Sequence, residues 1–166
     1  MKKTIIVLAS LLTVSFAGAQ DVKEADVPAA VKDAFKKQFP DVKKAEWEKE
    51  GANYEAEFDV VRVAMDDPKA KKQEIEKSVV YTATGELVQT EEEIAVSSLP
   101  KAVADYVTKN YAGKKISEAA KITEANGTVM YEAEVGKEDL IFDANGNFVK
   151  KEVETDDKDD DKEKKK

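Results

Sequence analysis

Two stretches of the chain show the same amphipathic pattern. In residues 27–39, apolar side chains recur at every fourth position: Val27, Val31, Phe35 and Phe39. In residues 99–111, at a constant offset of 72, the matching positions are Leu99, Val103, Val107 and Tyr111. A four-residue spacing places apolar side chains in one stripe along a helix. The pattern therefore predicts two amphipathic helices that are copies of each other.

Helix start and stop signals support the same two segments. Pro28 and Pro100 lie in the expected first turn, where the missing backbone N–H has no intrahelical partner to lose. Pro40 is expected to end the first helix and Gly113 the second.

Strand patterns follow each predicted helix. Residues 54–58 and 131–135 alternate apolar and polar side chains, which is typical of strands with one buried face. Thr84-Gly85 and Asn145-Gly146 predict hairpin turns between later strands. The first unit is thus expected to have strands near 43–49, 54–65, 73–83 and 86–92, and the second near 116–123, 129–136, 138–143 and 147–153.

The predicted fold class is α+β, a tandem repeat of one helix plus a four-stranded antiparallel sheet, with the helices on one face. The first unit is expected to span residues 20–95 and the second residues 96–154. Between matched strands the first unit has a longer segment, residues 59–80, which predicts a long hairpin arm. The apolar phase changes after Val60, which predicts a bulge near Val60 or a strand covered on both faces.

Both ends of the chain are expected to lie outside this fold. Residues 1–19 have a basic start, a short apolar run and the sequence Ala17-Gly18-Ala19, which together indicate a signal peptide cleaved near Ala19. The apolar run is too short for stable membrane insertion. A periplasmic or secreted location follows. Residues 155–166 are charged and polar, and predict a disordered tail.

Composition excludes several functions. The formal net charge is −8, so we expect no nucleic-acid partner. The sequence has no Cys and no His, which removes Ser-His and Cys-His nucleophile pairs and the usual zinc ligands. We therefore expect no enzyme activity, and assign no catalytic residue, cofactor or metal ligand. The sequence leaves the oligomeric state open.

The order of these motifs resembles the PepSY-like family, also described as β-lactamase-inhibitor-like. The resemblance rests on the Pro-x-Ala-Val helix starts, on Ala45-Glu46-Trp47-Glu48, on residues 54–58 and on the Gly-containing hairpins. It implies an exported bacterial protein with two units whose sheets lie side by side. Each helix would cover one sheet face and leave the opposite face open. The chain departs from the β-lactamase inhibitor, which relies on disulfides, in having no Cys.

The open face predicts an inhibitor-like protein that binds a protein or peptide partner. The candidate partner-binding residues are Trp47, Glu55, Glu57, Arg62, Glu132 and Glu134. Trp47 has an alternative place in the helix-side core beside Phe35 and Phe39, as do Tyr54 and Tyr131. The glutamates are alternatively an ordinary solvated strand face.

Two other functions fit the sequence. One is a small-ligand or calcium-binding module that uses acidic turns, although residues 143–147 have the wrong spacing for a calcium loop and predict a hairpin turn. The other is a protease regulator that acts in trans.

Overall fold

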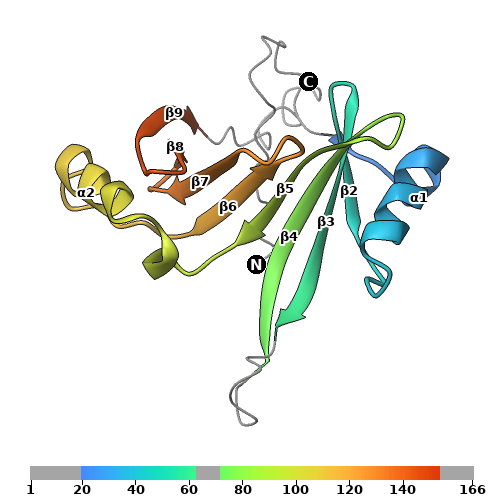
Figure 1. The fold of residues 1–166 in the computed structure, drawn as a ribbon, viewed down its shortest axis with the longest axis horizontal. Coiled ribbons are helices and arrows are strands. Elements are labelled where there is room, and N and C mark those ends of the chain that lie inside the picture. The colour runs from blue at the N-terminus through green and yellow to red at the C-terminus, as the bar shows by residue number, and fades with distance from the viewer. Residues whose placement is uncertain (1–19, 63–71, 154–166) are drawn as a thin grey trace, which may run out of the picture.

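The computed structural model describes residues 20–62 and 72–153. They form an α+β fold in which two α-helices pack on a single antiparallel sheet of nine strands (Figure 1). The strand order in the sheet follows the chain from β1 to β9, so each strand pairs with the next strand along the chain. No helix in this part of the chain is long and apolar enough to cross a membrane.

Both predicted helices are present. Helix α1 spans Ala29–Gln38 and α2 spans Lys101–Asn110. Pro28 and Pro100 lie one residue before the first helical residue of each. Each helix follows a short 3-10 turn, η1 (Glu24–Asp26) or η2 (Val96–Ser98).

The strands have clear bounds. In chain order they are β1 (Gln20–Asp21), β2 (Glu46–Glu50), β3 (Asn53–Arg62), β4 (Gln73–Thr82), β5 (Leu87–Glu93), β6 (Ala119–Glu124), β7 (Val129–Glu134), β8 (Glu138–Asp143) and β9 (Phe148–Val153).

The expectation of two separate sheets is wrong. Strands β5 and β6 pair directly, with register from Gln89↔Glu124 to Glu93↔Ala120, and this pair makes one continuous sheet. An unpaired strand edge leaves backbone N–H and C=O groups without partners. Pairing β5 with β6 satisfies both inner edges at once, which explains why the two halves join.

The expected bulge near Val60 is also wrong. The β3–β4 register runs without a break from Asn53↔Thr82 to Arg62↔Gln73. Val61 is 56% exposed, so the strand is not covered on both faces there. The described part of the long arm is a regular hairpin, and residues 63–71 of the predicted arm lie outside the described residues. Register shifts occur instead at Val80/Tyr81 and Ile141/Phe142, beside the two Gly-containing turns.

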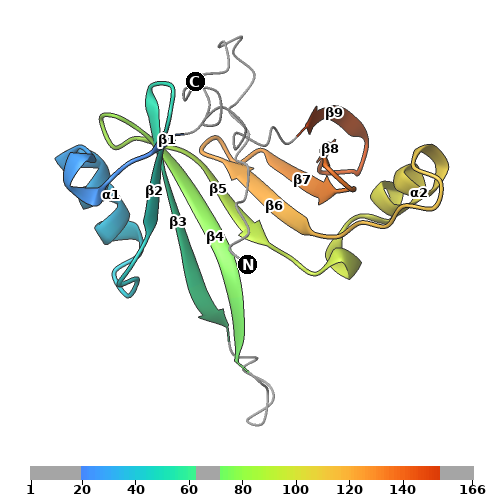
Figure 2. The same cartoon turned by 180° about the vertical axis from the view of Figure 1, so that it is seen from behind.

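Each helix buries its stripe on the same face of the sheet. Val31 and Phe35 of α1 pack with strand side chains that include Trp47, Phe58 and Tyr81. Val103 and Val107 of α2 pack in a second cluster with Ala133, Val135, Leu140 and Phe142. Tyr54 and Tyr131 are half-buried against these clusters, which confirms their predicted place in the core. The helices lie at opposite ends of the sheet, on its outer side (Figures 1 and 2).

Candidate functional site

The face of the sheet turned away from the helices is dominated by carboxylates. Side chains alternate between faces along a strand, and directly paired residues share a face. The registers therefore place Glu57, Ser78, Glu91 and Ile122 in one row across β3 to β6. We call this surface the acidic face, and its carboxylates include Glu48, Glu50, Glu55, Glu57, Glu91, Glu132, Glu134, Asp139 and Glu152.

Basic side chains are nearly absent from the acidic face. Among the described strand residues, only Lys150 is placed there by register, opposite Ile141. Lys150 is joined to Glu152 of its own strand at 3.0 Å. Other strand lysines, such as Lys77 and Lys121, lie on the helix side. Apart from Lys150, the charged strand residues that the structure describes on the acidic face are therefore all acidic.

The centre of the acidic face is buried rather than solvated. Glu55 and Glu91 are each 1% exposed, and neither has a hydrogen-bond partner on either carboxyl oxygen. Ile122 and Ile141, both 0% exposed, form a small apolar cluster on the same face. The prediction of a wet face is thus wrong at its centre.

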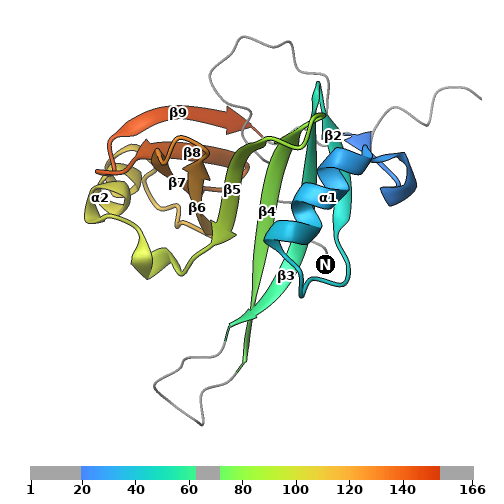
Figure 3. The ribbon, with the colours of Figure 1, turned by 45° about the vertical axis from the view of Figure 1, so that its right-hand side comes forward.

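Curvature of the sheet explains this burial. Glu50 lies on β2 and Glu152 on β9, at opposite ends of the sheet, yet their charges interact. In a flat sheet of this width such an interaction would vanish, because strands are spaced about 4.8 Å apart. The acidic face is therefore the inside of a curved sheet, as the turned ribbon in Figure 3 shows.

Burial raises the pKa of the central carboxyls. Loss of water raises the pKa of Glu91 well above its ordinary value, and the nearby carboxylates of Glu132 and Glu55 raise it further. Burial likewise raises the pKa of Glu55, with Glu50 adding to the effect. The Ser78 hydroxyl lowers that pKa in part, although the two groups do not reach hydrogen-bond geometry.

Carboxyls toward the β2 side of the face show the same effect. Burial, followed by the charge of Glu48, raises the pKa of Glu57 to about 8. Burial and Glu48 also raise the pKa of Glu50 to about 7. Part of the acidic face is therefore protonated near neutral pH.

The structure separates the predicted site residues. Glu55, Glu57, Glu132 and Glu134 share the acidic face, but Glu55 and Glu132 are 1% and 8% exposed. Trp47 lies on the other face, with its ring 5.3 Å from that of Phe35, so it is a core residue and not a partner anchor. Arg62 ends β3, and its side chain lies outside the described part of the structure.

Sequence reasoning missed Glu91 and Asp139. Glu91 belongs to the run Glu91-Glu92-Glu93, which resembles a solvated acidic stretch when read alone. Its burial depends on the pairing of β5 with β6, and no local pattern indicates that pairing.

The acidic side chains that the structure describes form no cluster typical of a metal site. Within residues 20–62 and 72–153, no three Asp or Glu side chains converge on one point where they could hold an ion. The 143–147 segment is the predicted hairpin turn, because Asp143 accepts hydrogen bonds from the backbone N–H groups of Asn145 and Asn147 at 2.8 and 2.9 Å. These bonds, with that from the Asn147 side chain, lower the pKa of Asp143.

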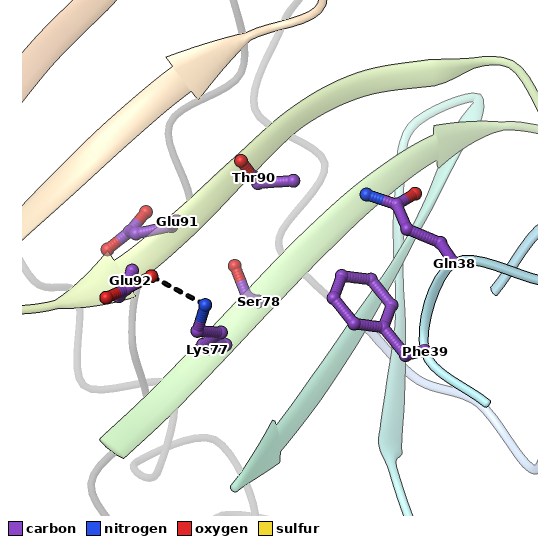
Figure 4. A pocket seen from close by; sticks show the side chains of 7 residues that line it. All are labelled: Gln38, Phe39, Lys77, Ser78, Thr90, Glu91 and Glu92. Carbon is purple, nitrogen blue, oxygen red and sulfur yellow. Dashed lines mark ion pairs between the residues drawn. The ribbon is translucent and has the colours of Figure 1, made fainter. Parts of the chain in front are cut away.

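A small cavity lies at the end of α1 (Figure 4). Its volume is about 220 Å³, and its lining consists of Gln38, Phe39, Lys77, Ser78, Thr90, Glu91 and Glu92. Lys77 and Glu92 form an ion pair of 2.5 Å across β4 and β5. Sites for small organic ligands are usually about 300 to 1,000 Å³. The cavity is therefore a poor match for the small-ligand alternative.

Comparison with known proteins gives one family match. The family described as "Putative beta-lactamase-inhibitor-like, PepSY-like" matches residues 16–67 and 69–150. No curated protein matches the chain.

Several solved structures share the fold. A Bacteroides eggerthii protein described as a "putative periplasmic" protein is 18% identical, with a TM-score of 0.60 over 76% of this chain and 88% of that chain. A DUF2874 family protein from Bacteroides ovatus is 20% identical, with a TM-score of 0.57 over 76% and 86%. A BLIP-like protein from Bacteroides fragilis is 22% identical, with a TM-score of 0.54 over 78% and 90%.

Proposed function

The chain belongs to the PepSY-like, β-lactamase-inhibitor-like family, and from this membership we propose that it is an exported, non-catalytic protein that binds a protein or peptide on its acidic face. The observation that carries the proposal is the single sign of charge on the inside of the curved sheet. Concave surfaces lined by one sign of charge focus the electric field and attract partners of the opposite sign. A protease is one candidate partner, because a protein that regulates a protease in trans acts by binding it and needs no catalytic activity of its own.

Composition and site geometry support a role without catalysis. The sequence contains neither His nor Cys, so it lacks the usual activated nucleophile pairs. The carboxyls with the most strongly raised pKa, Glu55 and Glu91, are buried on the inside of the sheet and not at the mouth of a large cleft.

Export is supported by the family's structural neighbours. The Bacteroides eggerthii protein is described as "putative periplasmic", and residues 1–19 of this chain predict a signal peptide cleaved near Ala19. An acidic inner face would then meet its partner in the periplasm or outside the cell.

The two halves of the sheet fit the tandem repeat that the sequence predicts. A Cβ built on Gly85 would lie 2.6 Å from the Ala30 carbonyl oxygen, and one built on Gly146 would lie 2.9 Å from Ala102 Cβ. Ala30 and Ala102 are separated by the same 72 residues as the two helix stripes. Equivalent turns thus meet equivalent helix positions, which supports the proposal that the halves are copies of one unit.

Site-specific photo-cross-linking tests the proposed binding face. A photoreactive residue at Glu93, exposed on the rim of the acidic face, is compared with one at Lys121, exposed on the helix side of the adjacent strand. We expect discrete cross-linked species in the native compartment from position 93 and none from position 121. Equal cross-linking from both positions, or none from either, would overturn the proposal.

A further inference from the structure

Glu91 is a buried carboxyl without a hydrogen-bond partner in residues 20–62 and 72–153. Its side chain is 1% exposed, and neither oxygen accepts or donates a hydrogen bond. Its cross-strand neighbours are Ser78, whose hydroxyl is also unpaired, and the fully buried Ile122. A polar group in such surroundings destabilises the fold unless something pairs with it.

The carboxylates around Glu91 further disfavour its ionised form. Glu55 and Glu57 act on it from β3, Glu132 from β7 and Asp139 from β8, all with the same sign. Lys150, the basic residue on the described part of this face, is engaged by Glu152. Among the strand residues that the structure describes, the registers place no lysine or arginine other than Lys150 on the face that Glu91 shares.

Resting on the proposed function, we propose that Glu91, with Glu55 two strands away on the same face, receives a lysine or arginine side chain of the bound protein partner. A basic side chain suits this place because its charged end can pair with a carboxylate while its long apolar stem tolerates a buried position. A chelated metal ion suits it less, because metal binding needs several converging oxygens and the described residues provide no such group. The partner is therefore expected to present a basic segment to the acidic face.

Such binding has a measurable proton signature. A cation beside a carboxyl stabilises its ionised form, so a carboxyl that is protonated in the free protein loses its proton when the cation arrives. Binding near neutral pH should therefore release protons into the buffer. Glu57 and Glu50, whose pKa values are raised to about 8 and about 7, would release protons as well, so the contribution of Glu91 is the difference in proton release between the wild type and Glu91→Gln.

Calorimetric titration with a peptide of alternating lysine and alanine tests the inference. The titration is run at pH 7 in two buffers of different ionisation enthalpy, on the wild type and on Glu91→Gln. Glu92→Gln is the matched control, because it makes the same side-chain replacement at the next residue, whose side chain lies on the helix side against Lys77. We expect Glu91→Gln to weaken binding at least about tenfold and to reduce proton release, and Glu92→Gln to change neither.

The outcomes separate this inference from the proposed function. If the peptide binds the wild type but Glu91→Gln binds equally and proton release is unchanged, the basic-side-chain inference is wrong while face binding stands. If the lysine peptide does not bind although cross-linking at position 93 succeeds, the inference is again wrong. Failure of the cross-linking experiment overturns the proposed function, whether or not the peptide binds. A peptide of alternating glutamate and alanine should not bind, and equal binding of it would also contradict the inference.

Discussion

Glu91 of β5 lies directly opposite Ile122 of β6, in the strand pair that joins the two halves of the sheet. A buried carboxyl beside a fully buried isoleucine is an arrangement that stability alone does not favour. Natural proteins usually retain such groups where function requires them. The seam between the two halves is therefore the place where stability and binding are expected to conflict.

Replacing Glu91 by glutamine should stabilise the protein at pH 8. At pH 8 the carboxyl of Glu91 ionises more readily in the unfolded wild-type chain than in the folded protein, and this favours unfolding. Glutamine has nearly the same shape but cannot ionise, so the variant does not have this destabilising effect. We expect a gain in stability at pH 8 and almost none at pH 4, measured by urea unfolding. Glu92→Gln, which breaks the partly exposed pair with Lys77, should change stability by less than about 1 kcal/mol. A Glu91→Gln protein less stable than the wild type at pH 8 would contradict the buried, unpaired state of Glu91.

The wild-type protein should lose stability between about pH 4.5 and pH 8. The pKa of Glu57 is raised from an ordinary 4.5 to about 8 and that of Glu50 to about 7, so the folded state holds protons that the unfolded chain releases. The contribution of these two carboxyls to the free energy of unfolding is fully present below pH 4.5, the pKa that they have in the unfolded chain. It is lost as the pH rises through the pKa values that they have in the folded protein. We expect a melting temperature at least about 3 °C lower at pH 8 than at pH 5.

The opposite trend would show that the acidic face is solvated. Glu138 and Asp143 have lowered pKa values, which make the protein less stable as the pH falls below their ordinary range. Their effect lies below the window from pH 5 to 8. Rising stability across that window would therefore contradict the raised pKa of Glu57 and Glu50. The Glu57→Gln variant should show a shallower decline than the wild type.

The helices and most strands could be predicted because their signals are local. The four-residue spacing from Val27 to Phe39 and the Pro at each start determine α1 without reference to any other part of the chain. The alternation in 54–58 likewise assigns Glu55 and Glu57 to the face opposite Trp47 and Phe58.

The burial of the acidic face could not be predicted because it depends on distant pairing. Alternation tells which residues share a face but not whether that face is concave. The curvature that brings Glu50 and Glu152 into interaction arises only after β5 and β6 join the halves. The burial of Asp139 could not be predicted for the same reason. In the sequence it lies in an ordinary strand segment, with no local pattern that indicates burial.

Replacing Phe35 by alanine should strongly destabilise the first half. The Phe35 ring lies between 5.2 and 5.4 Å from the rings of Phe58, Trp47 and Phe39. Its removal leaves a cavity among them, and such substitutions cost about 3 to 5 kcal/mol. The fluorescence of Trp47, the single tryptophan, should shift to longer wavelength in the folded variant.

The control for this prediction is Val107→Ala, at the matching position of α2. Val107 lies in the other core cluster, so this variant should leave the Trp47 emission of the folded protein unchanged. It should also lose less stability than Phe35→Ala, because the substitution removes fewer side-chain atoms. A shift of the emission in Val107→Ala would contradict the separation of the two clusters.

Replacing Gly85 by alanine should test how closely the first hairpin approaches α1. Gly85 has φ of +83°, and a Cβ there would lie 2.6 Å from the Ala30 carbonyl oxygen. Gly127 in the β6–β7 turn is the matched control, since it has φ of +88° but nothing within 4 Å of the same position. Both substitutions carry the backbone cost of a left-handed alanine, about 1 kcal/mol. Only Gly85→Ala adds a clash with helix backbone, which should raise its total cost to about 3 kcal/mol in urea unfolding. Equal losses of unfolding free energy in the two variants would mean that the turn can move away from α1. The close contact between Gly85 and Ala30 would then not determine the position of the hairpin.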